Sequence, residues 1–189
     1  KDSVAIDTEA TGLKIPERDK LSLIQLCDAS GNVYVIQPDR KTYKAPNLVS
    51  ILEDEKILKI GHYLRFDKNA LEFFLKCKIK NIFDTKIASK VVRTYTDQHG
   101  LKNLVYEFCN KNLDKRAGSS DWNKNINELT DKQLEYAAND VIYLHKIKNE
   151  LEKMLKRENR MDLYQNCITF LDTRIALDQS GFKFDIFEH

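Results

Sequence analysis

No stretch of this chain is long and apolar enough to cross a membrane, because charged and polar side chains interrupt every hydrophobic run. The sequence also lacks the charged, apolar and small-residue succession of a secretory signal peptide. Internal repeats, low-complexity tracts and linkers rich in Pro, Gly and Ser are missing as well. These absences predict a cytoplasmic protein with no membrane partner and a single domain over residues 1–189. Since the chain starts at Lys1 without Met, we expect a short native piece before it.

Cysteine pairs at metal-binding or redox spacing are absent too. The four cysteines, at positions 27, 77, 109 and 167, are widely separated and have apolar neighbours. Without a Cys-x-x-Cys motif, a zinc knuckle or a redox-active disulfide is disfavoured. We therefore expect reduced, buried thiols at these positions.

An excess of positive charge is also lacking. Lysine and arginine total 31 against 29 acidic residues, which gives a formal net charge of +2. A protein that grips long nucleic acid needs an extended basic surface, and this balance does not provide one. The composition instead suits a short anionic substrate at a local site. With 189 residues, 42% of them hydrophobic, the chain is long enough to bury a sizeable core.

Apolar residues alternate with polar ones in the first part of the chain and then recur at helical spacing. This change of period predicts strands with interleaved helices, followed by a helical half from residue 100 that one polar stretch, 110–129, interrupts. Such an order favours an α/β fold with a mixed sheet covered by helices. The expected strands are a first one through Asp7 and Glu9, then 21–27, 33–36, 57–60 and 81–83; the expected helices are 45–55, 65–76 and 85–94, the last capped by Asp84.

Two acidic residues end the first strand, in the sequence Val4-Ala5-Ile6-Asp7-Thr8-Glu9. Side chains i and i+2 of a strand point to the same face, so the carboxylates of Asp7 and Glu9 are expected to meet. Like charges beside an apolar strand repel each other and lose hydration, which a divalent cation would offset. The alternative is an exposed acidic turn ended by Gly12, and for this short motif alone it is the better interpretation.

A third acid, Asp67, falls in the first turn of the helix expected after the fourth strand. The positive end of the helix dipole favours an anion there, so a plain helix-end charge is the alternative. His62 and Arg65 lie at the same strand-to-helix turn. They are candidate phosphate ligands, although such residues are more often only solvated.

A late helix brings a fourth acid together with a tyrosine. Thr130 and Gln133 form a capping box, which predicts that the helix starts there. Tyr136 and Asp140 are four residues apart and share one face of this helix, and the small Ala137 allows a close approach to the sheet. Taken alone, the helix is equally compatible with a solvated face on which Tyr136 is a partly buried aromatic.

The combination of Asp7-x-Glu9, Asp67 and Tyr136-x-x-x-Asp140 resembles the DEDDy family of 3′-5′ exonucleases. The resemblance implies a ribonuclease H-like domain, in which a five-stranded mixed sheet has helices on both sides. It also implies two divalent metal ions, Mg²⁺ or Mn²⁺, about 4 Å apart. In that pattern Asp7 bridges both ions, with Glu9 and Asp140 on the first. Asp67 supports the second through water, and Tyr136 positions the attacking water.

A longer match narrows the resemblance to ribonuclease D-like proteins, and within them to the small nano-RNase C group of alphaproteobacteria. It implies one exonuclease domain over the whole chain, a closed ring of eight subunits, and hydrolysis of 5′-phosphorylated RNA dinucleotides to nucleoside 5′-monophosphates. Three phenylalanines in a short tail, at 182, 184 and 187, also favour a homo-oligomer, because one small domain can hardly bury them all. The segments that carry the match are 84–90, 93–102, 119–122, 171–174 and 185–187.

Several residues are candidates for substrate contacts. Leu13 resembles the leucine that related short-RNA exonucleases insert between bases, with a core leucine as an equal alternative. Trp122, the only tryptophan, would either stack on a base or pack in the core, and core packing is the slightly better interpretation. Arg93, His99 and Lys102 are candidate phosphate ligands, although a charged run is usually only a solvated face.

Two other classes of function stay open. One is a different nuclease, either a ribonuclease D-like enzyme that trims RNA 3′ ends or a DNA exonuclease. The other is a non-catalytic RNA-binding scaffold on a nuclease fold. The acidic residues argue against a scaffold, because four converging carboxylates that lose hydration serve no purpose without a cation.

Overall fold

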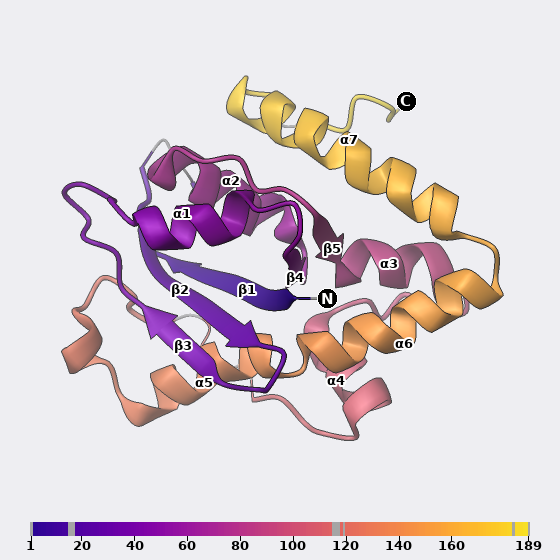
Figure 1. Cartoon of the computed structure of the whole chain (residues 1–189), viewed down its shortest axis with the longest axis horizontal. Coiled ribbons are helices and arrows are strands. Elements are labelled where there is room, and N and C mark those ends of the chain that lie inside the picture. The colour runs from indigo at the N-terminus through magenta and orange to yellow at the C-terminus, as the bar shows by residue number, and fades with distance from the viewer. Residues whose placement is uncertain (1, 15–17, 115–117, 119, 183, 189) are drawn as a thin grey trace.

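The structure is a computed structural model that describes residues 2–14, 18–114, 118, 120–182 and 184–188 (Figure 1). Its centre is a five-stranded sheet in the order β3-β2-β1-β4-β5. β1, β2 and β3 form an antiparallel meander, whereas β4 and β5 run parallel to β1. The predicted mixed sheet is therefore confirmed. The strands are β1 (Ser3–Ala10), β2 (Leu21–Asp28), β3 (Val33–Ile36), β4 (Leu58–Gly61) and β5 (Ile82–Asp84).

Helices cover both faces of the sheet. On one face, α1, α2 and part of α7 pack against side chains such as Ile6 and Ile24. On the other face, α3, α4, α5 and α6 pack against Ala5, Cys27 and Ile60. Figure 1 shows α1 and α2 on one side of β1 and β2, and α5 on the other. The helices are α1 (Pro46–Glu53), α2 (Leu64–Leu75), α3 (Thr85–Val92), α4 (Leu101–Cys109), the short 3₁₀ helix η2 (Ile126–Glu128), α5 (Asp131–Ile142), α6 (Leu144–Arg157) and α7 (Met161–Gln179).

The helical second half is confirmed, with local corrections. α3 ends at Val92 rather than at residue 94, because Arg93 leaves the helical conformation and directs its guanidinium toward Glu107. The polar stretch before residue 129 contains the short helix η2. Among the described residues no helix has the length and apolar character needed to span a bilayer.

The four cysteines are free thiols, but not all of them are buried. Cys27 and Cys77 lie in the core, Cys109 is half-buried, and Cys167 on α7 is exposed. The expectation of buried thiols is therefore wrong for Cys167. Apolar neighbours in sequence did not reveal this, because the buried face of α7 is formed by Tyr164, Ile168 and Leu171 instead.

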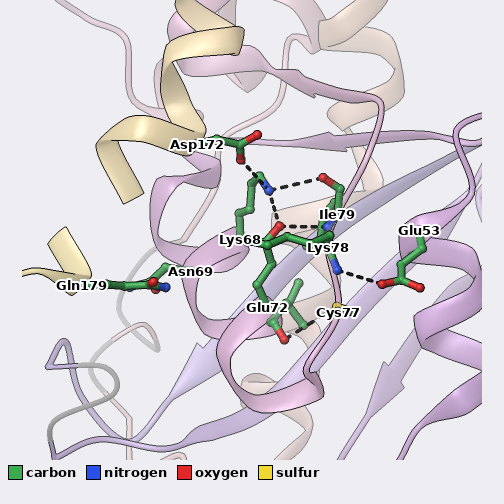
Figure 2. Close-up of polar contacts among 10 residues, drawn as sticks. Glu53, Lys68, Asn69, Glu72, Cys77, Lys78, Ile79, Asp172 and Gln179 are labelled. Carbon is green, nitrogen blue, oxygen red and sulfur yellow. Dashed lines mark hydrogen bonds and ion pairs between the residues drawn. The ribbon is translucent and has the colours of Figure 1, made fainter. Parts of the chain in front are cut away.

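A buried ionic network fastens α2 to the chain before β5 and to α7 (Figure 2). Lys68 is 2% exposed and forms ion pairs with Glu72 and with Asp172 of α7, the latter at 2.8 Å. Glu72 also accepts a 2.9 Å hydrogen bond from the backbone N–H of Ile79. Buried charges need such partners to offset lost hydration. The network holds α2, which carries Asp67, against α7.

Two further contacts join the same helices. Arg65 donates two hydrogen bonds of 2.6 Å to the carboxylate of Asp178 on α7. Asn69 accepts a 2.7 Å hydrogen bond from the side chain of Gln179 (Figure 2). Together with Lys68, these residues form one polar face of α2 directed at α7.

Candidate active site

Asp7 and Glu9 point to the face of the sheet that α5 covers. Ala5 packs on this face with residues of α5 and α6, whereas Ile6 packs on the opposite face with α1 and α2. The alternation of a strand places Asp7 and Glu9 on the side of Ala5. Beyond Glu9 the register of β1 with β2 shifts by one residue: Glu9 is paired with Leu23, whereas Ala10 is paired with Leu21. Such bulges redirect side chains and are frequent beside active sites.

The capping box that starts α5 is confirmed. Thr130 accepts a hydrogen bond from the backbone N–H of Gln133 at 3.3 Å, and the Gln133 side chain accepts from the backbone N–H of Thr130 at 3.1 Å. Ala137 is fully buried between α5 and the sheet, in a cluster with Leu23 and Trp122. This close approach carries the side chains of Tyr136 and Asp140 to β1.

Three carboxylates converge where α5 meets β1. Asp7, Glu9 and Asp140 each offer an oxygen atom, and these atoms all lie within 4.8 Å of one another. Carboxylate oxygens at this spacing are the ligands that hard cations such as Mg²⁺ prefer. The donor set therefore fits a divalent metal ion, as the sequence pattern predicts.

Asp67 is not one of the three members of this cluster. It is in the first turn of α2, is 4% exposed, and accepts a 2.6 Å hydrogen bond from the hydroxyl of Thr8. Burial raises the pKa of Asp67 to about 7, although the Thr8 hydrogen bond opposes this shift. A nearby cation would favour the ionised form again.

Tyr136 stands among the acidic side chains. Its pKa is raised, first by burial and then by the negative charges of Asp140, Glu9 and Asp7. A phenol in this environment keeps its proton and acts as a hydrogen-bond donor rather than as a base. Gly118 approaches the ring closely, since a Cβ atom at position 118 would lie 2.7 Å from the Tyr136 hydroxyl. Any larger residue there would displace the hydroxyl.

Asp84 has a second structural role that its sequence position does not reveal. As predicted, it caps α3 by accepting from the backbone N–H groups of Lys86 and Ile87, at 2.8 and 3.0 Å. It also accepts from those of Tyr63 and Leu64, at 3.3 and 2.7 Å, where α2 begins. Tyr63 has a left-handed backbone, with φ of 66°. One buried carboxylate thus fixes the turn that leads to Asp67.

A groove of about 610 Å³ extends from Tyr136 along the start of α5. Its lining combines both signs of charge with hydroxyl and amide groups. This volume is in the range of pockets that bind small ligands rather than of extended channels. The lining includes Ser120, Lys124, Thr130, Lys132, Glu135 and Asn139.

The structure separates the two apolar candidates for base contacts. Leu13 is 86% exposed just beyond β1, so the alternative of a core leucine is wrong. Trp122 is 4% exposed and packs with Leu23, Leu129 and Ala137, which confirms the preferred alternative of core packing. Its buried ring offers no face for stacking on a base, so its assignment to the substrate site is corrected.

The candidate phosphate ligands also differ in exposure and in side-chain partners. Arg93 is 2% exposed and is occupied by Glu107, Ser89 and the carbonyl of Gln98, so its assignment as a phosphate ligand is corrected. The sequence did not reveal this because Glu107 lies 14 residues away on α4. The remaining four candidates have at least partly exposed side chains: His62 contacts Thr85 at 2.9 Å, Arg65 is paired with Asp178, His99 contacts Ser89 at 2.8 Å, and Lys102 is exposed on α4.

Comparison with known proteins identifies the architecture. The 3′-5′ exonuclease family matches residues 1–156. NrnC of Brucella melitensis is 46% identical, with a TM-score of 0.93 over the whole of this chain and 90% of that one, and it has been solved bound to pGG and with bound Mg²⁺. Ribonuclease D of Haemophilus influenzae is 34% identical over 83% of this chain, and DNA polymerase I of Aquifex aeolicus is 33% identical over 79%.

The chain spans 38% of the length of that ribonuclease D and 24% of that polymerase. The likeness to NrnC covers nearly the full length of both proteins and confirms the expected ribonuclease H-like exonuclease fold. The resemblance to ribonuclease D-like proteins is confirmed as well. The family match spans most of the chain and includes the strand and both helices that carry the four acids, and so the chain belongs to the 3′-5′ exonuclease family.

Proposed function

We propose that this protein is a metal-dependent 3′-5′ exoribonuclease that hydrolyses very short RNA, with 5′-phosphorylated dinucleotides as preferred substrates and nucleoside 5′-monophosphates as products. The observation that carries the proposal is the convergence of Asp7, Glu9 and Asp140 within 4.8 Å, with Tyr136 beside them. Family membership supports the reaction class. The structure of Brucella NrnC bound to pGG supports the size of the substrate.

Two divalent ions, Mg²⁺ or Mn²⁺, would be held by the acidic residues. Asp7, Glu9 and Asp140 would provide direct ligands, and Asp67 would contribute through water. When bound, such ions lower the pKa of water and stabilise the charge that develops on the departing oxygen. The bound Mg²⁺ in a Brucella NrnC structure supports the choice of metal.

Tyr136 would orient the attacking water rather than take its proton. Burial and the surrounding carboxylates raise its pKa, so the hydroxyl stays protonated and donates a hydrogen bond. Ala137 and the capping box of Thr130 hold the helix that presents this hydroxyl. The residues of α5 would thus position the water, and the acids of β1 and α5 would hold the metal ions.

Charge and space support the proposed preference for a short substrate. The net charge is +2, so few phosphates can be neutralised along a strand. The groove beside Tyr136, of about 610 Å³, is the size of a small-ligand pocket. Exposed Leu13 would separate the bases. His62, Arg65, His99 and Lys102 are the remaining candidates to bind the 5′ phosphate.

We further propose that the protein acts in the cytoplasm as a homo-oligomer, a closed ring of eight subunits. Phe184 and Phe187 in the tail are 61% and 77% exposed, and Phe182 is 40% exposed. Such a cluster of apolar side chains is costly in water and favours a contact between subunits. A monomer measured by light scattering at micromolar concentration would contradict this assembly.

A length series tests the proposed substrate. End-labelled RNA and DNA strands of two to about twenty nucleotides are compared by kcat/KM at fixed salt and metal. We expect a steep maximum at the dinucleotide. Equal efficiency on twenty-mers would favour a ribonuclease D-like trimming enzyme, and equal efficiency on DNA would favour a DNA exonuclease. Binding without hydrolysis would favour an RNA-binding scaffold.

A further inference from the structure

Gln25 of β2 is a buried polar residue that the proposed reaction does not yet use. It is fully buried, and neither the nitrogen nor the oxygen of its side-chain amide has a hydrogen-bond partner among the described residues. A buried amide without partners costs free energy, so its presence in a native protein calls for an explanation, such as an ordered water or a functional role. The neighbours of Gln25 in the sheet indicate that role.

In the sheet, Gln25 lies directly opposite Asp7. The antiparallel register pairs it with Asp7 on β1 on one side and with Val35 on β3 on the other. Side chains of directly opposite residues share one face of a sheet and lie close together. Val35 is apolar and offers no hydrogen bond. Asp7 is therefore the only polar side chain among its two register partners.

The amide lies in the layer between the sheet and α5. Leu23, two residues earlier on the same strand, shares the face of Gln25 and packs against Trp122 and Ala137. α5 also carries Asp140 and Tyr136. The Gln25 side chain thus lies on the face of the sheet that carries Asp7 and is shielded from bulk solvent.

We propose that Gln25 is a positioning residue of the metal site, whose amide provides an outer hydrogen bond to the Asp7 carboxylate through one bridging water. This inference rests on the proposed function, in which Asp7 is a metal ligand. Carboxylates that bind a metal are commonly held in place by hydrogen bonds from neighbouring groups. Loss of such a partner usually weakens metal affinity about 10- to 100-fold.

The test compares metal binding by the parental protein with that of Gln25→Met, which removes the amide at similar volume. Isothermal titration with Mn²⁺ and the rise in melting temperature with Mn²⁺ are the two readouts. We expect metal affinity to fall about 10- to 100-fold, whereas the metal-free melting temperature stays equal or rises because an unpaired buried amide is removed. Turnover at limiting metal falls, and saturating metal restores part of it.

Ser22→Ala is the matched control. Ser22 lies on the same strand, is fully buried and also has an unpartnered side-chain oxygen among the described residues, but the bulge leaves it without a register partner on β1. The Ser22→Ala substitution should leave the affinity for Mn²⁺ unchanged. If Gln25→Met also leaves metal affinity unchanged, Gln25 is a packing residue and the inference is wrong.

Asp7→Asn separates this inference from the proposed function. If Asp7→Asn leaves metal affinity intact, the proposed metal site itself fails. If Asp7→Asn lowers it and Gln25→Met does not, only the role of Gln25 fails. Should Gln25→Met not fold, nuclear magnetic resonance of the parental protein decides. The Gln25 side-chain NH₂ signals must then shift on addition of Mg²⁺ and must not shift in Asp7→Asn; any other pattern overturns the inference.

Discussion

The hydroxyl of Thr8 donates a 2.6 Å hydrogen bond to the carboxylate of Asp67, across 59 residues of sequence. Thr8 stands between Asp7 and Glu9 in the chain but points to the opposite face of β1, toward α2. The first strand therefore serves both sides of the site. The side chains of Asp7 and Glu9 face α5. The Thr8 hydroxyl between them in sequence binds Asp67 of α2 on the opposite face.

Replacement of Thr8 by Val tests this contact. The hydrogen bond lowers the pKa of Asp67, so its loss should raise that pKa and move the acid limb of the kcat/KM profile to higher pH, by about one unit. Thr8→Ser keeps the hydroxyl and should retain the parental profile. An unshifted profile in Thr8→Val would show that Asp67 does not limit activity at low pH.

Replacement of Asp7 by Asn separates catalysis from folding. Removal of one of three converging carboxylates relieves repulsion, so the melting temperature of the metal-free protein should stay the same or rise. Activity should fall at least about 100-fold, since a direct ligand matters more than an outer one. Calorimetry and steady-state kinetics measure both. Parental activity in well-folded Asp7→Asn would refute the proposed site.

Replacement of Tyr136 by Phe should act on turnover alone. The change deletes the hydroxyl that orients water but retains every carboxylate. We expect kcat to fall about 100-fold, the usual effect of losing one positioned donor, while the Mg²⁺ concentration for half-maximal activity stays unchanged. A fall in kcat together with a rise in the Mg²⁺ concentration for half-maximal activity would instead indicate that the hydroxyl supports a metal ligand.

Leu13 and Trp122 are two apolar residues that differ in burial, so their replacement should affect different properties. Trp122→Leu should lower the free energy of unfolding by about 2–4 kcal/mol, because Trp122 is 4% exposed, and change kcat/KM of the folded enzyme little. Leu13→Ala should leave stability within about 0.5 kcal/mol and lower kcat/KM, because Leu13 is 86% exposed. Urea unfolding and dinucleotide kinetics measure the pair, and the reverse pattern would contradict both assignments.

Lys59 predicts a pH dependence of stability. Its ammonium group is buried, donates to the carbonyls of Asp54 and Ile57 at 2.7 and 2.8 Å, and has its pKa lowered by burial to about 8. The unfolded chain holds this proton up to a pKa of about 10.4, so between these values the unfolded state binds more protons. The free energy of unfolding should therefore rise from pH 8 toward pH 10, relative to the variant Lys59→Met.

Urea unfolding at several pH values measures this difference. Lys56→Met, which alters an exposed lysine in the turn before β4, serves as the control and should follow the parental curve. A parental curve parallel to that of Lys59→Met would show that Lys59 titrates at its ordinary pKa in the folded protein.

The features predicted from sequence are those with local causes. The alternation of β1 brings Asp7 and Glu9 together, and the capping box of Thr130 starts α5, because each depends only on neighbours in the chain. Together with the family resemblance, such features are enough to predict the five-stranded mixed sheet and the meeting of Asp7, Glu9 and Asp140.

The features that sequence did not predict depend on distant partners. Arg93 is buried because Glu107 and Ser89 receive its guanidinium. Asp84 caps α2 as well as α3 because β4 and β5 end side by side, which only the parallel pairing reveals. In the sequence Gln25 is an ordinary strand residue, and only the register of the sheet shows that it lies opposite Asp7.

The ion pair between the buried Lys68 and the exposed Asp172 has a consequence for how α7 separates from α2. α7 lies beyond residues 1–156, which the family match covers, yet it supplies the partners of Lys68 and Arg65 on either side of Asp67. Separation of α7 from α2 would leave Lys68 with one fewer partner in the core. In amide hydrogen exchange the two helices should therefore lose protection together, as one cooperative unit, so that fraying at the C-terminus reaches the active-site helix.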